Sequence, residues 1–453
     1  MAVKKSKKKR ASNRRDGAGN GGRVSTTPIF PPPLRTAHNE DGMLEEREWA
    51  FHRLLWLRAR DIRLWAVAEA ENRRGLFGSA VPAWLVEEEE AAARESALAM
   101  SIRVIAAMAR YPEVVHERDV RTACMTISEW ADNNHLPNTA LQYAEAAALV
   151  DRLSAHAAAH AGQVCAQNGL DHRAEVWYER GIKIGRRTED WEWYVRSNIR
   201  MGILRYEQGD FRAAIRCYQR ARTQAIWAGL PAFAGKAHHD MLLIAIAVRS
   251  FSRGDRHARS ALEFYPVHYE RLPQLAHDYA VLLTTFGCDA EALRLLDLCL
   301  PHIERPCERI AVLGTIAKAA AGVGDIDQHL AAIQDVQLLA AMSDLNAAGA
   351  FALAAEGAAA LDAFDRALRL ASRGMEIATR RREREPQRRA AVVLRSIARR
   401  RGLPTPPRPD PARVAETVAM FVGRLADLGA QTTDAGAHSR GRGELTKFTI
   451  AGR

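Results

Sequence analysis

The sequence lacks any long uninterrupted hydrophobic run. Its most apolar stretches, residues 242–248 and 347–360, are either short or interrupted by a glutamate, whereas a membrane-spanning helix needs about 20 mostly apolar residues. The basic first residues are not followed by the apolar segment of a secretory signal. We therefore expect a cytoplasmic protein that does not enter a membrane.

Paired cysteines and strand patterns are also missing. The six cysteines form no C-x-x-C motif, and scattered cysteines in a large chain of this kind are typically reduced and buried. Few segments alternate between apolar and polar residues, and runs of β-branched residues are absent, which argues against an extensive sheet. From Met43 onward apolar residues instead recur at three- and four-residue spacing, which predicts an all-α protein.

Lysine is scarce outside the first ten residues, which hold five of the nine lysines. Residues 1–23 carry a net charge of +8 and residues 380–402 another +8, which leaves −5 for the rest of a chain whose total is +11. The body of the protein is therefore mildly acidic, and its positive charge is concentrated in two segments.

Residues 1–41 are basic at first and then rich in glycine and proline. This composition cannot bury enough apolar area to offset the entropy of ordering, so we expect a disordered tail. Such a tail either binds a polyanion such as nucleic acid without reading its sequence or only aids solubility. The residues expected to contact a polyanion are Lys4, Lys5, Lys7, Lys8, Lys9, Arg10, Arg14 and Arg15.

The clearest internal pattern runs from Arg196 to Ala221 and reads RSNIRMGILRYEQGDFRAAIRCYQRA. It resembles a tetratricopeptide repeat, which consists of two antiparallel helices joined by a tight turn. Gly202 and Ala214 stand where the two helices are expected to cross closely, because only small side chains fit at such a crossing. Gly209 stands at the turn, where glycine permits a sharp reversal of the chain.

Weaker copies of this pattern occur along residues 112–384. The resemblance therefore implies a right-handed superhelical solenoid of helix–turn–helix repeats, with repeats lengthened like those of some bacterial regulator sensor regions. A helical region at 42–111 precedes the repeats, and basic capping helices at 385–430 and a flexible tail at 431–453 follow them. The turns are expected near residues 135, 169, 209, 254, 287, 324 and 362.

Members of this family bind partners in a concave groove lined by the first helix of each repeat. The alternative is that the corresponding residues here are ordinary solvated helix faces. Some members hold the acidic end of a chaperone with paired Lys and Asn residues; residues such as Ile199 replace them here, so that activity is not implied. The groove residues that the resemblance implies are Glu129, Asp132, Asn133, His156, Gln163, Gln167, Arg196, Ile203, Tyr206, Gln274, His277 and Lys318.

No catalytic motif stands out in the sequence. His156 and His160 lie one helical turn apart, but no third metal ligand accompanies them. A P-loop and a G-x-S-x-G motif are absent. A further set is similar to the ligands of metal-dependent phosphohydrolases but lacks the wider spacing of that family: His238, His239, Asp240, His277 and Asp278.

These observations predict a protein-interaction scaffold or sensor, not an enzyme, with no cofactor and no metal. Its partner would be a protein, bound as a peptide or helix in the groove. The alternative is a nucleic-acid-associated regulatory protein that uses its basic terminal segments.

Overall fold

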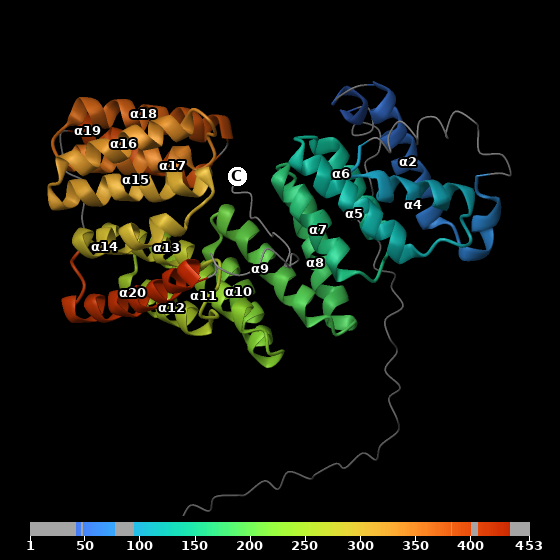
Figure 1. The fold of residues 1–453 in the computed structure, drawn as a ribbon, viewed down its shortest axis with the longest axis horizontal. Coiled ribbons are helices and arrows are strands. Elements are labelled where there is room, and N and C mark those ends of the chain that lie inside the picture. Colours follow the sequence, from blue (N-terminus) through green and yellow to red (C-terminus); the bar gives the residue numbers. More distant parts are fainter. Residues whose placement is uncertain (1–41, 47–48, 78–94, 382, 400–405, 435–453) are drawn as a thin grey trace, which may run out of the picture. The chain divides into compact units, whose positions relative to one another are not determined.

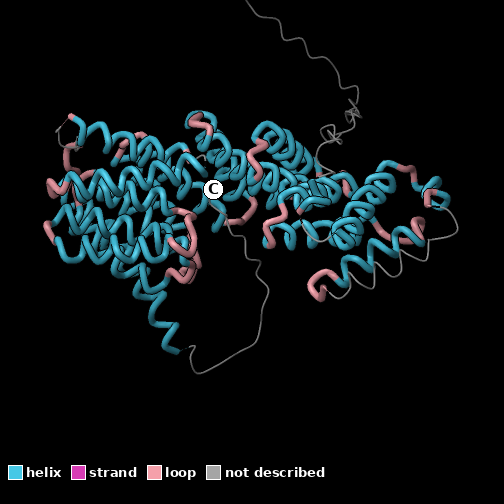
Figure 2. The backbone as a smooth tube through the Cα atoms, turned by 90° about the horizontal axis from the view of Figure 1, so that it is seen from above, coloured by secondary structure: helices cyan, strands magenta, loops and turns pink. Residues whose placement is uncertain are grey.

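The structure, a computed structural model, describes residues 42–46, 49–77, 95–381, 383–399 and 406–434. The predicted basic tail, with its lysines and arginines, lies outside these residues. Within them every regular element is a helix (Figure 2), which confirms the predicted all-α fold. None of the described helices is long and apolar enough to span a membrane.

Seven consecutive helical hairpins occupy residues 117–381 of the described chain (Figure 1). Each second helix packs against the first helix of the next hairpin, and successive first helices also touch. This is the predicted stack of tetratricopeptide-like repeats, in which neighbouring units complete one another's core. The hairpins are α5 (Glu117–Asn133) with α6 (Pro137–Val150), α7 (Ala155–Gln167) with α8 (Asp171–Arg187), α9 (Trp191–Glu207) with α10 (Phe211–Trp227), α11 (Pro231–Ala247) with α12 (Phe251–Phe264), α13 (Leu272–Thr285) with α14 (Asp289–Cys299), α15 (Pro306–Val323) with α16 (Ile326–Ala340), and α17 (Ala347–Ala360) with α18 (Phe364–Arg381).

Local sequence signals set where many of these helices begin. The carboxylates of Asp190, Asp210 and Asp325 each accept a hydrogen bond from the backbone N–H three residues later, at the starts of α9, α10 and α16. These bonds satisfy donors that the helix itself leaves unpaired. A proline occupies the first turn of α6, α11, α13 and α15, where its missing N–H has no helical partner to lose.

All seven hairpin turns share one backbone geometry. One residue in each turn has a positive φ, and the N–H of the next residue donates to the carbonyl five residues earlier at 2.8–3.0 Å. This bond closes the end of the first helix and reverses the chain. The residues with positive φ are His135, Gly169, Gly209, Arg249, Gly287, Gly324 and Asp362.

One predicted turn is wrong. The sequence pattern placed the fourth turn at Gly254, but the chain reverses at Arg249, and Gly254 lies inside α12. The turns at 209, 249 and 287 are thus 40 and 38 residues apart, so the repeats are more even than expected. Gly254 is instead a packing position, because a Cβ there would lie 2.6 Å from Leu282 Cδ2.

Close helix packing in several hairpins depends on a glycine that faces a tyrosine ring. A Cβ at Gly202 would lie 2.4 Å from Cε1 of Tyr218, and a Cβ at Gly162 would lie 2.6 Å from Tyr178. Real Cβ atoms do not approach ring carbons this closely, so these first helices can hold the ring only because the residue is glycine. The predicted close crossing at Gly202 is therefore made with the ring of Tyr218, while Ala214 is fully buried nearby in the same core.

Among the described residues, the elements that precede the hairpins include α2 (Trp49–Val67), the 3-10 helix η1 (Ala70–Gly75) and α4 (Ala99–Arg110). α2 packs against α6, where the buried hydroxyl of Tyr143 donates to the carbonyl oxygen of Leu55 at 2.9 Å. The indole N–H of Trp65 donates to the carbonyl oxygen of Pro112 at 2.7 Å.

The last two helices follow different courses. α19 (Arg384–Ala398) packs on α17 and α18 and continues the stack. α20 (Pro411–Asp434) instead returns to α12, α13 and α14 (Figure 1). Its buried residues Val414, Val418, Phe421 and Leu425 recur every three or four positions, the spacing of one apolar helix face.

A buried carboxylate of the hairpin stack binds α20 through hydrogen bonds. Asp255 of α12 is fully buried and accepts hydrogen bonds from Tyr279 (2.9 Å), Thr417 (2.7 Å) and Arg413 (2.6 Å). The ring of Tyr279 also stacks on Phe421, with centroids 5.1 Å apart. α20 is thus held by both apolar burial and a satisfied polar network.

Candidate functional site

The twelve predicted groove residues all lie on first helices, from α5 to α15. On α5, Glu129, Asp132 and Asn133 are exposed, and the side chain of Gln167 on α7 donates to Asp132 at 3.4 Å. Further along, Gln274 of α13 donates to Glu308 of α15 at 3.1 Å. These side chains therefore bridge successive repeats, and we call the surface formed by the first helices the first-helix face.

Ile203 and Tyr206 of α9 are less exposed to solvent than expected for residues that line a groove. Both are half-buried and pack against the apolar cluster shared by α9, α10 and α11. Burial, together with the carboxylates of Glu385 and Asp278, raises the pKa of the Tyr206 hydroxyl to about 12. Gln163 of α7 is half-buried as well.

An aromatic bridge crosses from α7 to α11. His156 stacks on Trp193 with ring centroids 3.8 Å apart and planes 15° apart. The guanidinium of Arg196 lies 5.0 Å from the ring centroid of Trp193 and 4.6 Å from that of Phe233, and it pairs with Glu192 at 2.7 Å. A cation held between two ring faces is favourable and well oriented, so this part of the first-helix face is rigid.

A chain of buried polar groups then links α11, α13 and α15. His239 Nδ1 lies 3.0 Å from the hydroxyl of Tyr265, and His239 Nε2 lies 2.7 Å from Asp278. His277 contacts Asp278 at 3.5 Å and Thr315 at 2.9 Å. Burial alone would raise the pKa of Asp278, but hydrogen bonds from the two histidines hold it well below its usual range.

The histidine and aspartate positions that are similar to phosphohydrolase ligands are thus partly brought together, as a hydrogen-bonded relay between helices. The hydroxyl-bearing ends of the relay, Tyr265 and Thr315, are buried and do not face solvent. Among the residues that the structure describes, no group of three or more His, Cys, Asp or Glu side chains is placed to hold a metal ion.

Ion pairs continue the first-helix face toward the C-terminus. Lys236 pairs with Asp240 within α11. Lys318 of α15 pairs with Glu356 of α17 at 2.7 Å, and Arg389 of α19 lies 3.7 Å from the same carboxylate. Burial would raise the pKa of Glu356, but the two cations lower it below its usual value. α19 therefore continues the surface begun by the predicted groove.

A cavity of about 670 Å³ opens where α11, α13, α15 and α17 end beside α19. This volume is in the range of ordinary ligand sites. Ile246, Val392 and several alanines form its apolar part. Its charged residues have both signs: Arg249, Lys318, Arg388, Arg389, Arg408, Asp289, Glu356, Asp362 and Glu385.

Of the predicted groove residues, Lys318 alone is among those that line this cavity. Arg249 carries no sequence signal for a turn and was not predicted to lie here. Arg388 and Arg389 were expected in a basic cap, and nothing in the sequence indicates that Arg408 returns to this place. The arginine-rich composition of residues 380–402 was the only available signal.

Acidification below pH 6.5 is expected to destabilise the fold through His156 and His160. Burial lowers the pKa of His160 to about 3 and that of His156 to about 4, where Arg121, Arg196 and Arg200 contribute to the shift. In the unfolded chain both titrate near 6.5, so between these values the unfolded state binds more protons, and the free energy of unfolding falls as the pH falls. The loss approaches about 1.4 kcal/mol per pH unit for each histidine.

Urea unfolding at pH 7, 6 and 5 would measure this dependence. The His160→Gln variant keeps a partner for Ser128, which lies 3.0 Å from His160 Nε2, and should show a shallower pH dependence than the wild type. Identical slopes for the two proteins would contradict the assignment.

No protein-family model matches the chain, and no curated protein matches it. Solved structures do resemble it. The chain is similar to a Rap protein complexed with competence and sporulation factor, with 11% identity over 74% of this chain and 99% of that one, and a TM-score of 0.47. It is similar to the Rap conjugation gene regulator of a plasmid in complex with the Phr* peptide, with 12% identity over 76% and 96% of the two chains and a TM-score of 0.43. It is also similar to a signal-transduction ATPase with a tetratricopeptide repeat sensor from Pyrococcus horikoshii, with 12% identity over 90% and 64% of the two chains and a TM-score of 0.43.

Proposed function

We propose that the first-helix face binds a peptide segment of a partner protein, and that the cavity beside α19 is its anchoring point. The observation that carries this proposal is the cavity itself, which is bounded by the ends of four successive first helices and by α19. Its lining combines cations, carboxylates and apolar side chains. A peptide offers matching groups along an extended backbone: charges of both signs, amide donors and acceptors, and small apolar side chains.

Tyr206 and Arg196 of α9 extend the proposed site toward the N-terminal repeats. Besides burial, Glu385 of α19 raises the pKa of the Tyr206 hydroxyl, and Arg389 and Arg388 lower it, which supports a path along the first-helix face from the cavity to α9. A peptide anchored in the cavity would therefore pass Tyr206 before it reached Arg196. The groups on this path are already held by neighbouring helices, which lowers the entropy cost of binding.

Arg196→Ala combined with Tyr206→Ala is expected to weaken peptide binding by about tenfold or more, the equivalent of about 1.4 kcal/mol. Peptides selected from a random display library on the wild-type protein would serve as probes, and fluorescence polarisation would measure their affinity. The exposed Arg395 of α19 is outside the cavity lining, so Arg395→Ala is the matched control. Unchanged affinity in the double variant, with its helicity intact, would move the binding site away from this face.

The nucleic-acid alternative stays a prediction. The cations of residues 1–23 lie outside the described residues, and several of those in the second basic segment pair with Asp344 or Glu356. Capture of partners from a lysate with and without nuclease separates the two. Partners that persist after nuclease treatment, and that the Arg196 and Tyr206 substitutions remove, support peptide recognition.

A further inference from the structure

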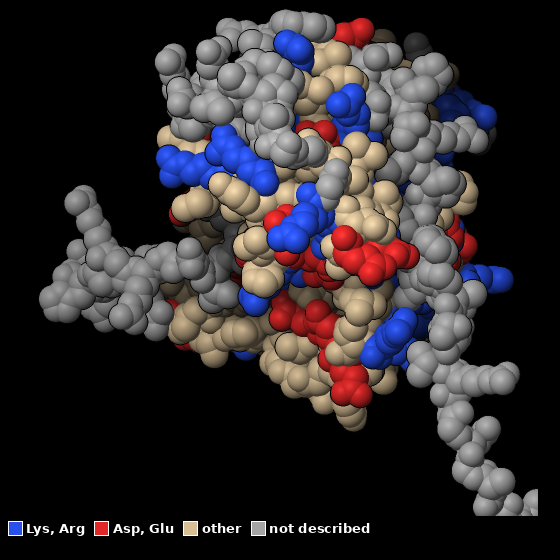
Figure 3. Space-filling view, turned by 90° about the vertical axis from the view of Figure 1, so that its right-hand side faces the viewer, with Lys and Arg blue, Asp and Glu red and all other residues tan. Residues whose placement is uncertain are grey.

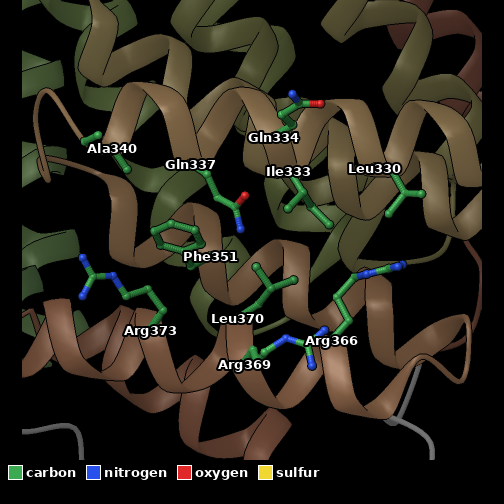
Figure 4. A pocket seen from close by; sticks show the side chains of 11 residues that line it. Leu330, Ile333, Gln334, Gln337, Ala340, Phe351, Arg366, Arg369, Leu370 and Arg373 are labelled. Atoms are coloured by element: carbon green, nitrogen blue, oxygen red, sulfur yellow. The ribbon is translucent and has the colours of Figure 1, made fainter.

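A second cavity lies between α16 and α18, which are second helices of the last two hairpins. It has a volume of about 750 Å³. Figure 4 shows Gln334 and Gln337 on one wall, Arg366, Arg369 and Arg373 on the other, and Phe351 between them. The remaining lining residues are apolar: Leu330, Ile333, Ala340, Ala341 and Leu370. We call this feature the α16–α18 groove.

The charged side chains that line this groove are all positive. Its lining contains three arginines and no carboxylate. On the face of the protein in Figure 3, by contrast, Lys and Arg side chains lie among Asp and Glu side chains. Arg373 also pairs with Glu376 on its own helix at 2.7 Å, but both side chains are about half exposed, and such a pair is weak and easily exchanged.

Exposed apolar side chains occur at the α16 side of the groove. Leu338 lies next to Gln337 on α16, and Met342 follows the end of that helix; they are 68% and 77% exposed. Leu330 within the groove is 36% exposed. Exposed apolar side chains that adjoin a depression are typical of a protein-binding surface rather than of an ordinary solvated helix.

Within this chain, one helix already packs on the second helices of other hairpins. α20 packs on α12 and α14, which are second helices of earlier hairpins. It buries an apolar stripe that includes Val418 and Phe421 and adds the charge-assisted bond from Arg413 to Asp255. The α16–α18 groove offers the same combination with the opposite sign, since here the receiving surface supplies the cations.

We propose that the α16–α18 groove binds an amphipathic helix of a partner protein, with an apolar stripe toward Phe351 and Leu370 and acidic residues toward the arginines. Arg366, Arg369 and Arg373 are spaced three and four residues apart and so share one side of α18. They would pair with Asp or Glu residues at similar spacing on the incoming helix. This site differs in its elements and in its ligand from the first-helix face.

Two other occupants fit the groove less well. The segments of this chain at residues 1–23 and 435–453 carry net charges of +8 and +3, so the arginines would repel both. A nucleic-acid backbone would pair with the arginines but would leave the apolar floor without a partner, because phosphate contacts require no such floor. An acidic amphipathic helix satisfies both parts of the groove at once.

The test uses the full-length protein and two designed helical peptides with one apolar stripe, flanked by glutamates in the first and by lysines in the second. We expect the glutamate peptide to bind and the lysine peptide to bind at least about tenfold more weakly. Arg366→Glu combined with Arg373→Glu should reverse this preference. Arg384→Glu, at an exposed arginine of α19, is the control and should leave the preference unchanged. Peptide fluorescence polarisation gives the affinities.

Three outcomes would overturn the proposal. The first is equal binding of the two peptides, and the second is the absence of binding at millimolar peptide. The third is that binding of the glutamate peptide does not depend on Arg366 and Arg373, whereas binding of duplex DNA does, or self-association of the protein measured by light scattering does. Failure of peptide capture at the first-helix face would not affect this result, because the two sites share no residue.

Discussion

The Asp255→Ala variant is expected to lose roughly 3 kcal/mol of its free energy of unfolding and to release α20. Asp255 is fully buried and accepts hydrogen bonds from Tyr279, Arg413 and Thr417. Alanine would leave these donors without their acceptor, and the loss of one partner from a buried ion pair costs about 3–5 kcal/mol. We expect the lower end of that range, because Arg413 is 44% exposed and regains water.

Urea unfolding and hydrogen exchange would measure the two parts of this prediction. The amides of α20 should lose their protection in the variant, while those of α7 to α10 keep theirs. Glu416→Ala is the matched control, since Glu416 is 64% exposed and its pair with Arg259 at 2.6 Å is a surface ion pair, which contributes little to stability. Full protection of α20 in Asp255→Ala would show that apolar burial alone holds the helix.

The Gly202→Val variant is expected to lose about 1–3 kcal/mol of stability, the typical cost of overpacking a core. A Cβ at Gly202 would lie 2.4 Å from Tyr218 Cε1, and the ring, itself 2% exposed, has little room to move. The clash strains the contact between α9 and α10 but not the helices themselves. The melting temperature should therefore fall, while the helicity of the folded protein stays unchanged.

A double-mutant cycle checks this physical cause. If the clash is with the ring, Gly202→Val and Tyr218→Leu together should cost less than the sum of the two single substitutions. Gly423→Val is the control, because a Cβ at Gly423 meets no atom within 4 Å. Strict additivity in the cycle would place the strain elsewhere.

The turns show how far the repeat pattern could be predicted from the sequence. Where glycine supplies the positive φ, as at Gly209 and Gly324, the pattern located the turn. At His135 and Asp362, which are not glycines, the neighbouring alanines and apolar residues of the repeat pattern located the turn. At Arg249 the same backbone geometry is held by the hydrogen bond from the N–H of Ser250 to the carbonyl of Ala245. This backbone bond does not depend on the side chain, so the sequence carries no signal for it. The turn was therefore predicted at a nearby glycine.

The helices that carry the candidate site could be predicted from the sequence. The first helices could be assigned because their contacts repeat with the period of the chain, and the implied residues lie on those helices. Their partners could not be assigned. His239 and Asp278 are 39 positions apart, and Arg408 reaches the cavity from beyond α19, so these pairings depend on how neighbouring repeats are aligned.

The sequence by itself determined that the chain forms antiparallel helix pairs, because apolar periodicity, caps and turns act within a few residues of one another. Only the tertiary structure decided where α20 docks and which of the repeat surfaces remain open. The apolar stripe of α20 would fit many helix surfaces, whereas the buried carboxylate of Asp255, 158 residues before Arg413, selects one. That selection is a long-range contact energy, and no local pattern in the chain contains it.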